Sequence, residues 1–246
     1  DFAAYGIDIV FEDRALEILA KNAFIENTGA RGLVSAVEGA LLVFEKKFPS
    51  TNIKKFPVTA TDVENPEKSL KKILALSNLD ELNETYEKLC LAEKEYIKRY
   101  LDSNKKIFAK KYGLTLTQSR IDVVASYYAS HIMDIEKVIK KIKSFYDDIK
   151  KIELYFFKTH DINIVLEDDA IDFIIDQLEN STYDLEAFYD HISTDFEYGL
   201  KLVQEKTGKN RFFITKDALM NPESFISNLI KDELNLHSKM NLKPMA

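Results

Sequence analysis

The chain has 246 residues, 46% of them hydrophobic, and a net charge of −7 at pH 7. The acidic balance argues against nucleic acid as a partner. Because no apolar run is long enough to span a bilayer and no signal peptide is visible, the sequence predicts no membrane partner and a cytoplasmic location. The single cysteine, Cys90, cannot form an internal disulfide, and its place on an apolar helix face predicts a buried, unreactive thiol.

Residues 1–74 show the pattern of a small domain in which helices follow short strands. Alternating apolar residues predict the strands, periodic apolar residues predict the helices, and Asp, Pro and Gly mark their ends. In chain order, the predicted elements are a strand at 7–11, a helix capped by Asp13, a helix from Gly32 to Phe48, a strand at 55–59 and a helix opened by Pro66. Pro57 lies in the second strand, which places that strand at a sheet edge or a bulge.

A glycine-bounded turn, Thr28-Gly29-Ala30-Arg31-Gly32-Leu33, separates the first two helices. Gly29 suits the left-handed residue that commonly closes a helix, and Gly32 lets a ligand or another backbone come close. The arginine carries a planar fork of five donors beside a helix N-terminus that already favours anions. The sequence therefore predicts a phosphate-binding turn made of Gly29, Ala30, Arg31 and Gly32.

Five motifs follow one order and spacing in this first part of the chain: 6–11, 13–16, 28–33, 37–38 and 48–50. The series resembles the C-terminal small domain, or lid, of AAA+ protein unfoldases of the ClpX type. In that family the arginine of the glycine-alanine-arginine turn is the sensor-2 residue, so the resemblance implies that Arg31 reaches the nucleotide phosphates. Val34 departs from the family, which often has a second arginine there. Without the resemblance, a surface arginine paired with Glu38 or another acid would be the simpler interpretation.

Residues 75–159 predict a helical hairpin or bundle, because glycine nearly vanishes and apolar residues fall into seams. The first helix of this region is expected to break near 102–104 or to end at Gly113. Thr115 and Thr117 can cap the next helix, and Asp134 can cap the last one. Apolar residues of the last helix recur in steps of three and four over about three heptads. We expect these seams to form an intramolecular core, with a partner-binding face as the alternative.

Residues 160–246 contain a faint copy of the first domain, followed by a C-terminal tail. The segment 162–171 echoes 7–16 at an offset of 155, and Asn221-Pro222-Glu223 echoes Asn65-Pro66-Glu67 at an offset of 156. At the first offset Arg31 corresponds to Glu186, and both flanking glycines are lost. Because a carboxylate repels phosphates, the second copy is interpreted as a structural or docking copy.

These patterns together predict an α+β, mostly helical protein of three domains: a lid-like domain at 1–74, a helical hairpin or bundle at 75–159 and a degenerate lid-like copy at 160–246. The sequence contains no phosphate loop, and its four histidines are scattered, so we predict no catalytic residue and no metal ligand.

The resemblance implies that the chain, which begins at Asp1, is the C-terminal fragment of an ATP-dependent unfoldase. ATP and magnesium would then bind the parent protein, and no cofactor is expected on this chain alone. The implied partners are the AAA+ large domain of the same protein and neighbouring subunits of a ring, with a peptidase or protein substrates as further candidates. The alternative is a non-catalytic module that docks substrates, adaptors or subunits.

Overall fold

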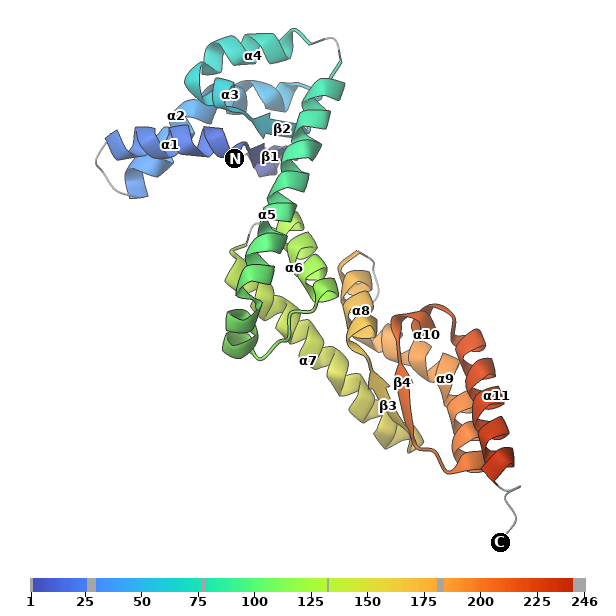
Figure 1. The fold of residues 1–246 in the computed structure, drawn as a ribbon. Helices are drawn as coiled ribbons and strands as arrows, with labels where there is room; N and C mark the ends of the chain where they lie inside the picture. The colour runs from blue at the N-terminus through green and yellow to red at the C-terminus, as the bar shows by residue number, and fades with distance from the viewer. Residues whose placement is uncertain (1, 26–29, 77, 132, 181–183, 241–246) are drawn as a thin grey trace. The chain divides into compact units, whose positions relative to one another are not determined.

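The computed structural model describes residues 2–25, 30–76, 78–131, 133–180 and 184–240 (Figure 1). It is mostly helical and contains two separate two-stranded parallel sheets, so the α+β, mostly helical class is confirmed. The chain forms two compact units, residues 1–96 and 97–246, called here the N-terminal and C-terminal units. This division lies inside a single long helix, and the boundaries predicted after residues 74 and 159 stay predictions.

The N-terminal unit contains one parallel strand pair with helices between and after its strands. Its elements are η1 (Phe2–Tyr5), β1 (Asp8–Phe11), α1 (Asp13–Ile25), α2 (Ala30–Lys47), η2 (Phe48–Ser50), β2 (Lys55–Val58), α3 (Ala60–Glu64), α4 (Pro66–Leu74) and the first part of α5 (Asp80–Tyr112). Asp8 lies opposite Lys55 and Phe11 opposite Val58. In a sheet of two strands every strand is an edge strand, which explains why Pro57 is tolerated within β2.

An aromatic cluster fixes α2 against the sheet of the N-terminal unit. Phe44 of α2, Phe48 of η2 and Phe56 of β2 are all fully buried. The Phe48 and Phe56 rings meet edge to face with centroids 4.8 Å apart, and the Phe44 and Phe56 centroids are 4.9 Å apart. Such aromatic pairs add to the gain from area burial. The aromatic contacts therefore hold α2 on the sheet.

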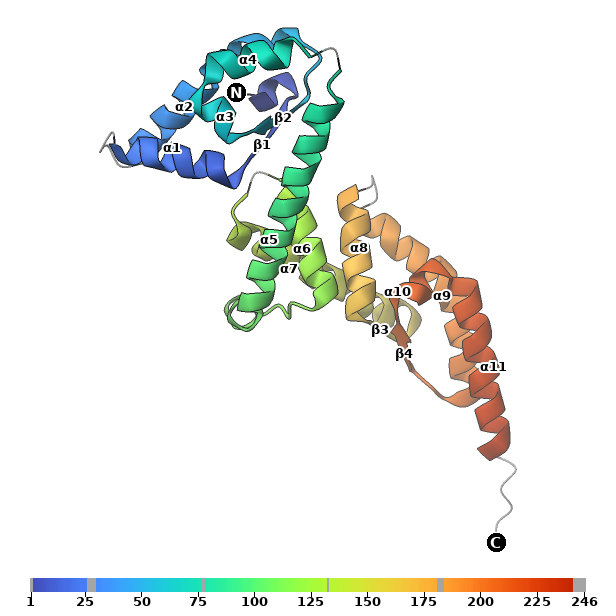
Figure 2. The ribbon, with the colours of Figure 1, turned by 45° about the horizontal axis from the view of Figure 1, so that its top comes forward.

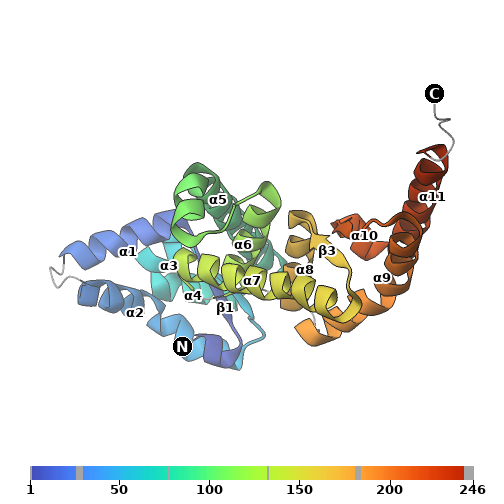
Figure 3. The same cartoon turned by 90° about the horizontal axis from the view of Figure 1, so that it is seen from below.

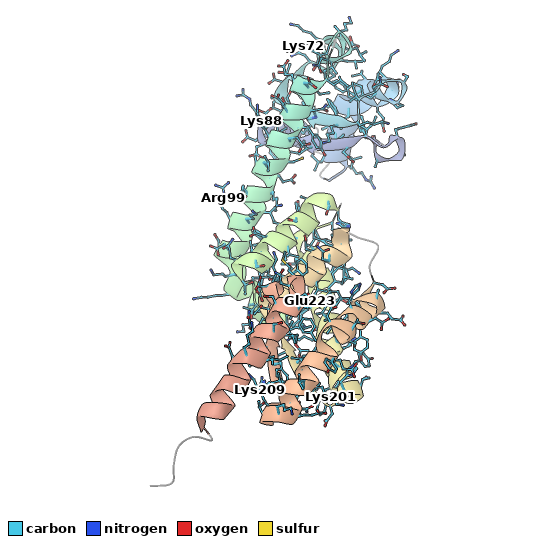
Figure 4. All side chains as sticks on the ribbon, turned by 90° about the vertical axis from the view of Figure 1, so that its right-hand side faces the viewer. Lys72, Lys88, Arg99, Lys201, Lys209 and Glu223 are labelled. Atoms are coloured by element: carbon cyan, nitrogen blue, oxygen red, sulfur yellow. The ribbon has the colours of Figure 1, made fainter. Side chains whose placement is uncertain are left out.

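The C-terminal unit begins with three helices and continues with a second parallel strand pair. Its elements are the rest of α5, then α6 (Gln118–Ser130), α7 (Ile135–His160), β3 (Asn163–Leu166), α8 (Asp168–Asn180), α9 (Leu185–Thr207), β4 (Arg211–Ile214), α10 (Lys216–Met220) and α11 (Pro222–Met240). Charged side chains such as Lys201 lie on its surface, as Lys72 and Lys88 do on the N-terminal unit (Figure 4).

Several predictions for the helical region are confirmed, and the structure decides between the two alternatives for its first helix. The Thr117 side chain caps α6 by accepting from Arg120 N, and the Asp134 side chain caps α7 by accepting from Lys137 N at 2.9 Å. The α7 seam is buried in the core of the C-terminal unit, as expected of an intramolecular seam. The first alternative, a break at 102–104, is absent: α5 continues through these residues, and the Asn104 side-chain amide donates to the Tyr100 carbonyl. The helix ends instead at Gly113, whose φ of 64° is left-handed.

The repeat of sequence corresponds to a repeat of structure (Figures 1 and 2). The series β1, α1, α2, β2, α3, α4, called here the first copy, recurs as β3, α8, α9, β4, α10, α11, the second copy. Asn163 pairs with Arg211 as Asp8 pairs with Lys55, so the registers agree at the two offsets seen in the sequence. Even the left-handed residue that precedes the first strand recurs, as Gly6 with φ 64° and Asp161 with φ 57°.

The helix pair with the most extensive contact differs between the two copies. In the first copy α1 and α2 lie side by side, and in the second copy α9 lies beside α11 (Figure 3). The second copy also packs α8 against α6 and α7 of its own unit, whereas among the described residues no helix from outside the first copy packs comparably on α1.

Candidate functional site

The predicted phosphate-binding turn lies at the beginning of α2. Ala30, Arg31 and Gly32 are the first three residues of this helix, which thus starts two residues earlier than the sequence predicts, and Gly29 lies outside the described residues. Gly32 is buried and the Arg31 side chain is exposed. Arg31 forms no ion pair with any described acidic residue, so the alternative pairing with Glu38 is not observed. The guanidinium is thus accessible at a helix N-terminus.

The first turn of α2 carries no acidic residue, unlike those of α1, α8 and α9. The first four backbone N–H groups of any helix lack partners within the helix, and the helix dipole places partial positive charge at the same end. A cation there costs the folded helix about 0.3–1 kcal/mol, while it strengthens attraction for an anion. Arg31 therefore makes this end favourable for a phosphate or carboxylate at the expense of helix stability.

The corresponding helix of the second copy has the opposite arrangement. Asp184 caps α9, its carboxylate accepting from Ala187 N at 2.8 Å, and Glu186 is the second residue of the helix. Glu186 is exposed, and its charge complements the helix dipole. At this end the Asp184 carboxylate takes up one of the free N–H groups, and the two acids repel anions. The interpretation of the second copy as a structural or docking copy stays a prediction.

An open pocket of about 430 Å³ beside α7 and β3 was not predicted from the sequence. Its charged lining is engaged in holding the fold. Lys150 Nζ lies 2.7 Å from Glu153 Oε1 and donates to the Leu166 carbonyl at 3.1 Å, while Leu166 N donates to Glu153 Oε1 at 2.8 Å. The pair thus satisfies the backbone N–H and carbonyl of Leu166 in β3. Arg211, also in the lining, lies 5.3 Å from the Phe213 ring.

Side chains with other possible chemistry are dispersed or chemically muted. No three His, Cys, Asp or Glu residues gather into a metal-binding group within the described part of the chain. The sequence predicts a fully buried Cys90, but its side chain is only half-buried. This partial burial raises the pKa of its thiol, which lowers the thiolate fraction at neutral pH. Among the described residues, none of the helices combines the length and apolar character that crossing a membrane requires.

Sequence reasoning missed a buried ion pair in the C-terminal unit. Arg120 of α6 is 1% exposed and Asp172 of α8 is 3% exposed, and Arg120 Nε donates to Asp172 Oδ1 at 2.6 Å. The guanidinium also lies 4.8 Å from the Tyr146 ring. One sequence signal pointed to this pair: Asp172 is a lone acid within the otherwise apolar run 171–175. An acid surrounded by apolar residues is expected to be buried only with a partner.

Comparison with known proteins identifies no family for this chain. No protein-family model and no solved structure matches the chain.

Proposed function

We propose that residues 1–74 are the lid of a ClpX-type AAA+ protein unfoldase, in which Arg31 contacts the phosphates of ATP bound with magnesium on a large domain. The observation that carries the proposal is an exposed arginine in the first turn of α2, unpaired with any described acid and set within the motifs that resemble the lid. Its planar fork can donate two parallel hydrogen bonds to phosphate oxygens. ATP and magnesium supply the phosphoryl chemistry when bound, and this chain contributes the arginine.

The core of the N-terminal unit gives such a contact a mechanical consequence. Because Phe44, Phe48 and Phe56 join α2 to the sheet, a force on Arg31 would be transmitted to the sheet and the rest of the first copy. The lid would then rotate as one body when phosphate binds or leaves, and neighbouring subunits of a ring would experience that rotation.

The test uses the parent protein that carries the phosphate loop. We expect Arg31→Ala to lower ATP turnover by at least about tenfold, because a charged contact to the reacting phosphates is lost. Arg14→Ala is the matched control, since Arg14 is an exposed arginine in α1 of the same unit. Equal turnover and nucleotide affinity in wild type and Arg31→Ala would exclude the proposal, as would a parent reading frame that encodes no phosphate loop.

A second candidate function, a non-catalytic docking module, is favoured by the C-terminal unit. The second copy presents Glu186 where the first presents Arg31, so this helix end does not attract a nucleotide. This function predicts that binding of a protein partner by the C-terminal unit is equal in wild type and Arg31→Ala. Loss of that binding together with ATP turnover would favour a single nucleotide-driven function for the whole chain.

A further inference from the structure

The two copies differ in the exposure of one face of their first helix. In both α1 and α8 one face packs into the copy's own core, with Ala15 and Leu19 corresponding to Ala170 and Ile174. A second face is buried in α8 but exposed in α1. Its residues are Ile171, Asp172 and Ile175 in α8, and at the offset of 155 they correspond to Leu16, Glu17 and Ala20 in α1.

Helix α6 packs on α8 together with α7 and contacts this second face through Arg120. Two contacts give the direction of α6. Near the start of both helices, Arg120 donates from Nε to Asp172 at 2.6 Å and from Nη2 to Asp168 Oδ1 at 3.3 Å. At the other end, His131 Nε2 lies 3.4 Å from Glu179 Oε1 in the last turn of α8. Helix α6 therefore runs parallel to α8, with its arginine against a pair of carboxylates and its apolar residues in the shared core.

The first copy keeps the chemistry of this face without a cover. Asp13 and Glu17 correspond to Asp168 and Asp172, so both carboxylates are retained, and both are exposed. Leu16 is 48% exposed and Phe24 is 85% exposed. No described cation forms an ion pair with either carboxylate.

Helix α5 places a further acid near this end of α1. Glu93 of α5 lies near Asp13. Burial is the larger cause that raises the pKa of the Glu93 carboxyl, and the negative charge of Asp13 raises it further. An apolar stripe bordered by such acids is a surface that an arginine-bearing amphipathic helix fits.

We propose that this face of α1 binds an amphipathic helix of a protein partner, lying parallel to α1 as α6 lies on α8. The partner helix places an arginine or lysine against Asp13 and Glu17 and apolar side chains over Leu16, Ala20 and Phe24. The pattern of the occupant follows α6, in which Arg120 precedes buried residues at 121, 124 and 125. The inference is independent of the nucleotide contact proposed for Arg31.

The probe is a peptide of residues 117–131, fluorescently labelled and stapled between positions 122 and 126, on the side opposite Arg120. It is titrated into the isotopically labelled chain of 246 residues without nucleotide. We expect saturable binding and shifts in the amide resonances of α1. Glu17→Lys should weaken binding by at least about tenfold, because it reverses the charge opposite the arginine. Glu38→Lys, an equally exposed change in α2, should leave the affinity unchanged.

A charge exchange makes the test specific. The peptide with Arg120→Glu should bind the Glu17→Lys chain more tightly than it binds the wild-type chain, and circular dichroism verifies that both chains are folded. Absence of saturable binding, equal affinity of the Glu17→Lys and Glu38→Lys chains, or shifts confined to α8 would each overturn the proposal. Since no nucleotide is present, these outcomes are separate from the outcome of the ATP turnover test.

Discussion

Arg31 and Glu186 occupy the same place in the two copies, each the second residue of its helix, α2 or α9. Glu186 complements the dipole of α9, whereas Arg31 opposes the dipole of α2. A residue that lowers the stability of its own helix is typical of a binding site, where function and stability compete. At the same place in the fold, Glu186 therefore supports the stability of its helix, whereas Arg31 is the residue proposed to contact a ligand.

Reversing the charge at position 31 should stabilise the N-terminal unit. We expect Arg31→Glu to raise the free energy of opening of α2 by about 0.3–1 kcal/mol, because a carboxylate in the first turn interacts favourably with the helix dipole. Amide hydrogen exchange along α2 measures this change without requiring both units to unfold together. Glu186→Arg is the matched control and should destabilise α9 by a similar amount. A destabilising Arg31→Glu would show that Arg31 has a structural partner.

How far the sequence predicted the structure can be seen at individual residues. Asp13, Thr117, Asp134 and Pro66 act locally, through caps and the first helical turn, so the elements they begin were predictable. The repeat was visible because strand register and the Asn-Pro-Glu helix start are also local patterns. The ion pair of Arg120 and Asp172 was not, since 52 residues separate its partners and only packing brings them together.

The predicted site shows the same limit. The motif placed Arg31 near a helix start, but its exposure depends on which face of α2 packs on the core. The sequence also placed the start of α2 at Gly32, while the helix begins at Ala30. Helix starts without a strong cap are poorly defined by local sequence, and this one has no acidic residue in its first turn.

Removing one partner of the buried pair should be far more harmful than removing both. Arg120→Met leaves Asp172 buried without its cation, and we expect a loss of about 3–5 kcal/mol in the stability of the C-terminal unit. The double variant Arg120→Met with Asp172→Leu should recover most of this loss, because no charge is then left buried. Urea denaturation of the four chains of this double-mutant cycle gives the coupling free energy. A double variant as unstable as the sum of its parts would contradict the prediction.

The effect of Arg120→Met should also depend on pH. Burial raises the pKa of Asp172 above its ordinary value, while Arg120 acts in the opposite direction. Without Arg120 the pKa rises further, so the folded state binds a proton that the unfolded state releases. A carboxyl of this kind destabilises the fold by its full penalty above its folded pKa. The penalty shrinks as the pH falls below that pKa and is gone below the pKa of the unfolded state. The loss of stability should therefore be largest near neutrality and smaller in acid.

The control for this pH dependence is the double variant, which has no carboxyl at position 172. Its stability relative to wild type should vary less between neutral and acidic pH than that of Arg120→Met. Parallel pH profiles for the single and double variants would show that Asp172 does not titrate in response to the lost arginine.

Two helical glycines should respond in opposite ways to alanine. Gly199 of α9 faces Ile226 of α11, and an added Cβ would overlap this side chain, with Ile226 Cδ1 only 3.0 Å away. Since overpacking costs about 1–3 kcal/mol, Gly199→Ala should destabilise the second copy. At Gly39 of α2 no described atom lies within 4 Å of the place that a Cβ would take. Gly39→Ala should therefore stabilise the first copy by about 0.5–1 kcal/mol through the lower entropy of the unfolded chain. Hydrogen exchange of α9 and α2 measures both changes. A stabilising Gly199→Ala would contradict the prediction, because it would show that α9 and α11 can move apart to accommodate the added Cβ without loss of stability.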